Sequence, residues 1–288
     1  MIKENYDFGS LHGYKTKGTV KQYMETSSLT DLVEVLRSSK ESNTRVVACG
    51  DGSNTLIRDY FNGLFIKWTK EDITPLKSDT QILLEVSSAV KKSDLIDYCI
   101  KNSFSGLEFW AGIPGLVGGG TAMNAGAYGL QGQDSIVGVE IVTPNGVVKK
   151  DNKELNWFYR KLELPQYSLI VSSTFCLKKG DKKQIKEKID GYIKDRECKH
   201  PLDFPSCGSV FKNPHSKENP DKGAWWFINE SGLSGLSIGG AKVSEKHTNF
   251  IINTGNATSS DIINLIQEVK NRVNEKFSVQ LEEEIKIF

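Results

Sequence analysis

The sequence predicts a protein of mixed helices and strands built in two parts. Apolar residues recur at helical spacing in some stretches, such as 262–273, and short strands such as 81–90 and 169–177 lie elsewhere along the chain. The chain changes character at residues 199–214, which hold three prolines and look irregular. Because 288 residues can bury a substantial core and form two domains, we place a domain boundary in this stretch.

Composition is that of an ordinary globular protein, with 38% hydrophobic residues, 25% charged residues and a formal net charge of +1. This balance predicts no nucleic-acid or membrane partner, and no apolar run is long enough to span a bilayer. The N-terminus lacks the apolar core of a signal peptide, and the five cysteines form no CxxC pair. We therefore expect a cytoplasmic protein with reduced thiols. The four histidines show no ligand spacing, so we expect no metal.

The N-terminal third is expected to contain short strands and two helices. Residues 1–27 show little pattern beyond turn-forming glycines. A helix begins near Leu29, with Ser28 or Thr30 as its N-cap, and Ser93 is expected to cap a second helix. Apolar strands are expected at 45–49, 62–68 and 81–90.

Glycines crowd residues 105–129, SGLEFWAGIPGLVGGGTAMNAGAYG, where charge is almost absent. Glycine lets main-chain N–H groups approach a ligand closely, and successive N–H groups in a turn form an anion-binding concavity. We interpret the stretch as a loop that holds a phosphorylated cofactor. The alternative, a flexible linker, would be polar, whereas this stretch contains Phe109, Trp110 and Leu116.

A second candidate phosphate cradle follows the strand at 45–49 directly. It reads Gly50-Asp51-Gly52-Ser53-Asn54, in which two glycines allow close approach and the last two residues carry short polar side chains. A tight turn between strands has the same pattern, so this motif taken alone leaves both interpretations open.

Between the glycine-rich loop and the boundary, residues 136–149 predict a hairpin about the turn Pro144-Asn145-Gly146. Arg160 follows a cluster of aromatic residues, which favours an arginine lying along the edge of a core. After a strand at 169–177, the charged stretch that follows predicts a helix with a seam of Ile185, Ile189 and Ile193.

Beyond the boundary, no GxSxG pattern surrounds Ser209, which taken alone is interpreted as a turn residue. Helices are expected at 224–231 and after a cap at Ser259 or Ser260, and a strand is expected at 249–253. The last ten residues, VQLEEEIKIF, alternate as a strand does. Glu283 falls in the apolar phase of that alternation, so periodicity singles it out among three consecutive glutamates.

Together these segments resemble the UDP-N-acetylenolpyruvoylglucosamine reductases, the MurB flavoenzymes of peptidoglycan precursor synthesis. The resemblance spans nearly the whole chain in the expected order. Its motifs are GDGSN at 50–54, GLEFWAGIPGLVGGGTAMNAGAYG at 106–129, YR at 159–160, HPLDFPSCGSVFKNP at 200–214, GLSGLSIGGAKVSEKH at 232–247 and the C-terminal stretch 261–285.

The resemblance implies an FAD-binding domain of the PCMH/vanillyl-alcohol-oxidase type and a separate α+β substrate-binding domain. The FAD domain would occupy residues 1–198, with subdomains of about 1–75 and 76–198, and the C-terminal strand 280–288 would return to it. The substrate domain would occupy residues 199–279. Residues implied in cofactor binding are Gly50, Asp51, Gly52, Ser53, Asn54, Ile113, Pro114, Gly115, Gly118, Gly119, Asn124, Ala125 and Gly126.

The implied reaction reduces UDP-N-acetylglucosamine enolpyruvate to UDP-N-acetylmuramate. Hydride from NADPH would reach C3 of the enolpyruvyl group by way of FAD, and a proton would reach C2. The family's pattern implies that Arg160 and Glu284 serve the substrate carboxylate and that Ser209 donates the proton. It thus selects Glu284 where periodicity singles out Glu283. Implied substrate-binding residues are Lys199, Asn213, Lys212 and His247.

Three positions depart from the family's pattern. Lys17 to Val20 read KGTV where GGxA is usual, Ser234 replaces a lysine, and Gly120 stands where a larger residue is common. The chain also resembles the family's shorter subclass, which lacks a tyrosine-bearing insert. The departures leave open a paralogue that uses FAD on another substrate, and a non-catalytic flavin or UDP-sugar binding protein is the third alternative. No heptad pattern predicts an oligomer, so we expect a monomer that binds small molecules only, with the oligomeric state left open.

Overall fold

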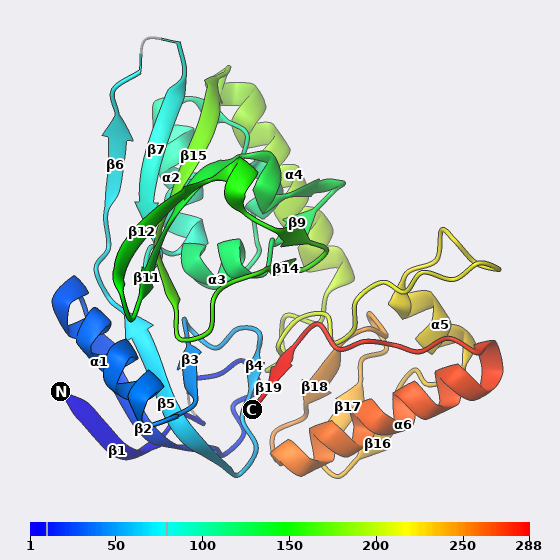
Figure 1. The fold of residues 1–288 in the computed structure, drawn as a ribbon. Helices are drawn as coiled ribbons and strands as arrows, with labels where there is room; N and C mark the ends of the chain where they lie inside the picture. The colour runs from blue at the N-terminus through cyan, green and yellow to red at the C-terminus, as the bar shows by residue number, and fades with distance from the viewer. Residues whose placement is uncertain (10, 79) are drawn as a thin grey trace. The chain divides into compact units, whose positions relative to one another are not determined.

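A computed structural model describes residues 1–9, 11–78 and 80–288 of the chain (Figure 1). The chain divides into two compact units, each assembled from segments that are far apart in sequence. The first unit comprises Met1–Glu4, Gln22–Gly50 and Asn62–Arg196. The second comprises Asn5–Lys21, Asp51–Phe61 and Glu197–Phe288.

A four-stranded sheet lies near the N-terminus, with the strand order β1-β2-β5-β3. Its strands are β1 (Ile2–Asp7), β2 (Thr19–Thr26), β3 (Val46–Ala48) and β5 (Tyr60–Trp68). Helix α1 (Leu29–Glu41) packs against it through Leu32 and Leu36, which share a core with Leu64 and Ile66 of β5. Ser28 is the N-cap as predicted, because its hydroxyl accepts a hydrogen bond from the N–H of Asp31.

The larger sheet of the first unit is antiparallel, with the order β12-β11-β15-β7-β6 and with β8 paired to β15. Its strands are β6 (Ile73–Leu76), β7 (Ile82–Ser87), β8 (Phe104–Ser105), β11 (Ile136–Thr143), β12 (Gly146–Asp151) and β15 (Leu169–Lys179). Strands β11 and β12 form the predicted hairpin. Helices α2 (Lys92–Asn102) and α4 (Lys182–Lys199) share one hydrophobic core with this sheet (Figure 1).

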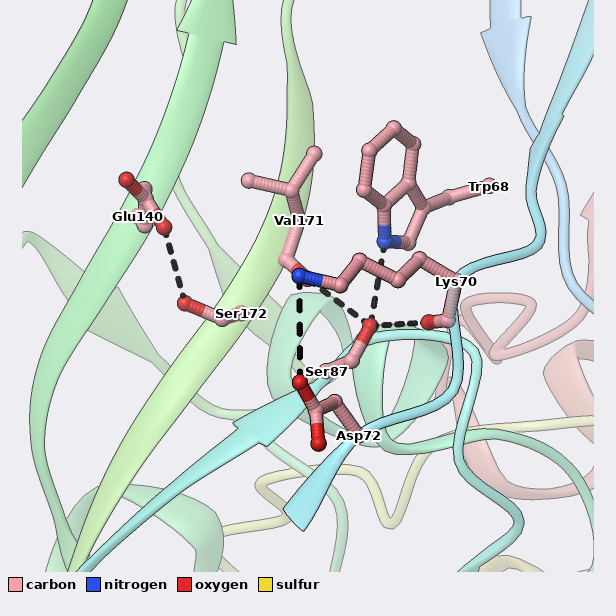
Figure 2. A network of polar contacts seen from close by, with 7 residues as sticks. All are labelled: Trp68, Lys70, Asp72, Ser87, Glu140, Val171 and Ser172. Atoms are coloured by element: carbon pink, nitrogen blue, oxygen red, sulfur yellow. Dashed lines mark hydrogen bonds and ion pairs between the residues drawn. The ribbon is translucent and has the colours of Figure 1, made fainter. Parts of the chain in front are cut away.

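A polar network fixes the end of β5 to the larger sheet (Figure 2). The indole N–H of Trp68 donates to Oγ of Ser87, 3.0 Å away, at the end of β7. Oγ of Ser87 lies 3.3 Å from the carbonyl oxygen of Val171 on β15 and also donates to the carbonyl oxygen of Lys70. One buried hydroxyl therefore connects three segments of the first unit.

The second unit contains a three-stranded antiparallel sheet of β16 (Ser237–Ile238), β17 (Ala241–Val243) and β18 (Ile251–Asn253). Helices α5 (Ala224–Glu230) and α6 (Ser259–Phe277) bury their apolar residues in the same core as β17 and β18 (Figure 1). Strand β19 (Lys286–Ile287), near the C-terminus, pairs in parallel with β4 (Thr55–Leu56). This pairing brings the GDGSN turn and the end of the chain together.

Three sequence predictions about helix ends and strands are wrong. Helix α2 begins at Lys92 after Lys91, and Ser93 donates its hydroxyl to the side chain of Asp94 rather than capping. Thr258 caps α6, because its side chain accepts from the N–H of Asp261. The expected C-terminal strand is confined to Lys286–Ile287, although its alternation correctly marks the buried side chains Val279, Leu281 and Ile285. Residues 279–285 pair with residues 210–212 through one isolated antiparallel bridge, between Phe211 and Glu283, which is too short to form a strand.

The seam predicted on the charged helix is shorter than expected. Ile185 and Ile189 of α4 are buried, whereas Ile193 is 36% exposed. The remaining short elements are β9 (Gly126–Ala127), β10 (Leu130–Gln131), β13 (Trp157–Phe158), β14 (Lys161–Leu162), helix α3 (Val117–Ala122) and 3₁₀ turns at Glu108–Trp110, Gly132–Asp134 and Asn152–Glu154.

Candidate functional site

The GDGSN turn joins β3 to β4 and presents a row of main-chain donors. Gly52 is buried and has a positive φ of 66°, a conformation that favours glycine. Among the described residues, the N–H groups of Gly52, Ser53 and Asn54 donate to no recorded acceptor. Three successive N–H groups of this kind form an anion-binding concavity, and leaving them unpaired is costly. The turn therefore fits a phosphate group.

A buried histidine packs behind this turn. A Cβ atom on Gly52 would lie 2.7 Å from Cα of His12, so only glycine fits there. Nε2 of His12 donates to the carbonyl oxygen of Thr16 at 3.0 Å, and burial lowers the pKa of His12 to about 4. Because His12 is neutral near pH 7, it adds no positive charge to the turn, whose own contribution to anion binding is its peptide dipoles and N–H groups.

The glycine-rich loop is built around the short helix α3, whose first N–H groups are already used by the protein. Val117 donates to the carbonyl oxygen of Val90 at 2.9 Å and Gly118 to that of Ser88 at 3.0 Å. A Cβ atom on Gly118 would lie 2.6 Å from Cβ of Ser88. Gly118 thus serves the packing of α3 against the segment after β7.

Other groups of the loop are available to a ligand. Within the described part of the chain, the N–H groups of Gly115, Leu116 and Gly119 have no recorded acceptor. Gly119 is exposed, and a Cβ atom built on it meets nothing within 4 Å. Oγ of Ser88 is buried and has no hydrogen-bond partner there. These groups fit the phosphorylated cofactor expected from the sequence.

Asn124 is buried and holds the loop in place. Its Nδ2 lies 3.0 Å from Oε1 of Gln133 and 3.1 Å from the carbonyl oxygen of Phe158, and its Oδ1 accepts from the N–H of Gln133. The side chain of Asn124 therefore connects the loop to the hairpin of β13 and β14. Any contact of this residue with a cofactor would involve its backbone.

Arg160 lies at the turn of that hairpin, with a positive φ of 57°. Its Nη2 donates to the carbonyl oxygen of Gly126 at 2.9 Å, and its guanidinium lies 4.8 Å from the ring centre of Tyr159. The structure thus brings Arg160 to the end of the glycine-rich loop within the first unit. These contacts are compatible both with an arginine at the edge of a core and with the expected substrate role.

Ser209 lies in the second unit, on a segment held from two sides. Val210 donates its N–H to the carbonyl oxygen of Asn249 at 2.8 Å. The carbonyl oxygen of Val210 accepts from the N–H of Glu284 at 2.7 Å. The structure therefore brings the chain at Ser209 beside the chain at Glu284.

The three consecutive glutamates have different partners. Glu283 forms an ion pair with Lys270, with Nζ and Oε1 2.7 Å apart, and Glu282 pairs with Lys212. Glu284 is half-buried and donates its N–H to Val210. Since Lys212 is engaged by Glu282, its predicted substrate role would require it to exchange partners.

The other expected substrate residues also lie in the second unit, and Lys199 and His247 lie on segments that contact each other. Lys199 is exposed at the end of α4, and Oδ1 of Asn213 accepts from the N–H of Ala224 at the start of α5. Nδ1 of His247 accepts from the N–H of Asn249 at 3.3 Å, and its ring packs edge-on against His200 with 5.4 Å between centres. Asn213 and His247 therefore also stabilise local structure.

Asn249 was not predicted from the sequence as a residue of the site. This buried amide donates to the carbonyl oxygen of Phe211 at 2.8 Å and accepts from its N–H at 3.0 Å, so it holds the segment that carries Ser209. The one sequence feature that could have indicated this role is its position at the start of the apolar strand expected at 249–253. Among the described residues, no group of three or more His, Cys, Asp or Glu side chains could hold a metal ion, and no helix is long and apolar enough to cross a membrane.

Two domain families match the chain in succession. Residues 20–152 match the family described as FAD binding domain, so the chain contains the cofactor domain of a flavoprotein. Residues 200–288 match the family described as UDP-N-acetylenolpyruvoylglucosamine reductase, C-terminal domain.

Relatives that match over most of their length are named UDP-N-acetylenolpyruvoylglucosamine reductase. The UDP-N-acetylenolpyruvoylglucosamine reductase of Listeria welshimeri is 39% identical, over 99% of this chain and 95% of that protein. The one of Syntrophus aciditrophicus is 35% identical, over 90% of this chain and 83% of that protein. This chain belongs to the UDP-N-acetylenolpyruvoylglucosamine reductase family.

A solved structure matches the whole fold. MurB from Thermus caldophilus has a TM-score of 0.83 and 26% identity, with 100% of each chain covered. The predicted fold class, α+β with an FAD-binding domain, is confirmed.

Proposed function

We propose that this protein reduces the enolpyruvyl group of UDP-N-acetylglucosamine enolpyruvate to form UDP-N-acetylmuramate, a step of peptidoglycan precursor synthesis. FAD would be the resident cofactor and NADPH the hydride donor. The observation that carries the proposal is the hydrogen bond from Glu284 N–H to the Val210 carbonyl, which brings the two expected chemical positions Ser209 and Glu284 onto adjoining segments. Membership in the reductase family over the whole chain supports it.

Two groups of residues would hold FAD. The unpaired N–H groups of 52–54 and those of Gly115, Leu116 and Gly119 would bind its phosphates without any cationic side chain. Asp51, Ile113, Pro114, Ala125 and Gly126 would add contacts beside them. When bound and reduced, FAD would supply the hydride that is added to C3 of the enolpyruvyl group.

The protein's own residues would manage the charge and the proton. Hydride addition at C3 leaves a carbanion at C2, delocalised into the neighbouring carboxylate as an enolate. Arg160, as a cation, and Glu284, as an acid that donates its proton in a hydrogen bond, would bind that carboxylate and stabilise the developing charge. Ser209 would transfer its hydroxyl proton to C2 and regain a proton from water, so that one hydride and one proton are added to the double bond.

The remaining expected residues would bind the UDP-sugar. Lys199 and Lys212 carry positive charge suited to a diphosphate, and Asn213 and His247 can form hydrogen bonds with the sugar. We assign the cofactor to residues 1–198 with the returning end 280–288, and the UDP-sugar to residues 199–279.

An anaerobic visible spectrum of the purified protein tests the proposal. NADPH should bleach a flavin band, and UDP-N-acetylglucosamine enolpyruvate should restore it, whereas UDP-N-acetylglucosamine, which lacks the enolpyruvyl group, should not. A flavin that bleaches without recovering would point to a paralogue with another acceptor. A protein that takes up no FAD would contradict the proposal entirely.

A further inference from the structure

The last residue of the GDGSN turn contacts the chain around Glu284 twice. Nδ2 of Asn54 donates to the carbonyl oxygen of Glu284, 3.2 Å away and 230 residues later in the sequence. The main-chain oxygen of Asn54 accepts from the N–H of Lys286 at 2.9 Å. All of these residues belong to the second unit.

The backbone of Glu284 is therefore held at both of its polar groups. Its N–H is bonded to Val210, and its carbonyl oxygen is bonded to Asn54. The next residue, Ile285, is only 3% exposed, and the parallel pairing of Lys286 with Thr55 follows. These contacts restrict rotation about the backbone bonds of Glu284, and so they restrict the direction in which its carboxyl group leaves the chain.

Only an amide suits position 54 in this role. Aspartate has no donor when ionised and would place a negative charge beside the carbonyl oxygen of Glu284. Alanine would leave that oxygen without its side-chain partner. The amide Nδ2 is separate from the N–H of Asn54, which belongs to the row of unpaired donors in the turn.

We propose that the side chain of Asn54 is a positioning residue for Glu284, while its main-chain N–H faces the cofactor phosphate. Asn54 would thus serve both cofactor binding and substrate binding. Its backbone forms part of the anion-binding turn, and its side chain fixes the position of the Glu284 carboxyl group, which binds the substrate carboxylate. This inference rests on the proposed function for the role of Glu284.

The test compares Asn54→Ala and Asn54→Asp with the control Asn271→Ala, an exposed amide on α6 that accepts from Gln267. In Asn54→Ala, FAD binding and flavin reduction by NADPH should change much less than flavin reoxidation does, because alanine keeps the main-chain N–H of the turn. Flavin reoxidation by the enolpyruvyl sugar should slow by roughly 10- to 100-fold, as misplacement of a reacting group by about 1 Å does. Asn54→Asp should be slower still, and Asn271→Ala should match wild type.

A double-mutant cycle gives the decisive comparison. In a Glu284→Gln background, Asn54→Ala should slow reoxidation by less than about 3-fold, because there is no carboxylate left to position. Full additivity of the two changes would overturn the proposal. Equal losses in both half-reactions, or loss of FAD with normal reoxidation of the flavin that remains, would assign the side chain to the cofactor instead.

Amide hydrogen exchange separates this inference from the proposed function. In the protein without FAD, Asn54→Ala should speed exchange at Glu284 and Lys286 by about 10-fold or more, and Asn271→Ala should not. If wild type fails to reduce the enolpyruvyl sugar, the proposed function fails, and the exchange rates still report on the restraint. Unchanged exchange in Asn54→Ala would overturn the inference in either case.

Discussion

Nζ of Lys270, on α6, lies 2.7 Å from Oε1 of Glu283. Both side chains are about one-third exposed, 28% for the lysine and 30% for the glutamate. This ion pair explains why a carboxylate occupies the apolar phase of the C-terminal alternation. The side chain of Glu283 stabilises the contact between α6 and the end of the chain, while its backbone pairs with Phe211. The backbone of Glu284 pairs with Val210, the residue next to Ser209.

Replacing each of these two glutamates by glutamine should therefore have different effects. Glu284→Gln should slow flavin reoxidation by the enolpyruvyl sugar by on the order of 100-fold, because it removes the acid proton that would bind the reacting carboxylate. Glu283→Gln should leave that rate nearly unchanged and lower the free energy of unfolding by at most about 1 kcal/mol, as expected for a partly exposed pair. Stopped-flow kinetics and urea unfolding measure the two effects. The reverse pattern would return the catalytic role to Glu283.

Ser209→Ala should separate the two half-reactions. Flavin reduction by NADPH should remain within about 2-fold of wild type, because no substrate proton is transferred in that step. Reoxidation should slow by roughly 100-fold or more, since C2 loses its proton donor. Anaerobic stopped-flow absorbance follows both steps in one sample. Equal slowing of the two steps would indicate a positional role for the serine.

The sequence alone predicted those parts of the fold that depend on residues close together in the chain. The N-cap Ser28 and the hairpin of β11 and β12 each follow from a few adjacent residues, and both are present. Strands β1 and β2 were missed in residues 1–27. In the sheet order β2 lies beside β5, about forty residues further along the chain, so local pattern carries little of the information.

The same limit applies to the candidate site. Pattern located both glycine motifs, but it could not show that the first N–H groups of α3 are used by Val90 and Ser88. Nor could it show that the amide of Asn54 contacts Glu284, because that hydrogen bond closes a loop of 230 residues. Tertiary packing therefore decides which main-chain N–H groups remain available to a ligand.

Two glycines of the cofactor loop should respond differently to alanine. Gly118→Ala should destabilise the protein by about 1–3 kcal/mol, because its methyl group would lie 2.6 Å from Cβ of Ser88. Gly119→Ala has open space and should fold normally, but the methyl group should weaken FAD binding by about 10-fold, since it covers a donor proposed to face phosphate. Gly191→Ala, at an open position on α4, is the matched control for both. FAD affinity in Gly119→Ala equal to that of the control would place the phosphates elsewhere.

The buried imidazole of His12 should make the free energy of unfolding depend on pH. Burial lowers the pKa of His12 to about 4 in the folded protein, compared with about 6.5 when unfolded. Between pH 6.5 and 4, His12 is therefore protonated in the unfolded chain but not in the folded protein. The free energy of unfolding should decrease as the pH is lowered from 6.5 to about 4. This pKa shift corresponds to about 3 kcal/mol of unfolding free energy over that pH range.

The variant His12→Gln removes the titrating group. Its free energy of unfolding, measured by urea titration, should therefore lose the part of the slope between pH 6.5 and 4 that His12 contributes. Other groups titrate in both proteins and cancel in the difference. Parallel pH profiles for wild type and His12→Gln would show that the pKa of His12 is the same in the folded and the unfolded protein. The turn behind which it packs would then carry a positive charge near its anion-binding donors only below about pH 6.5.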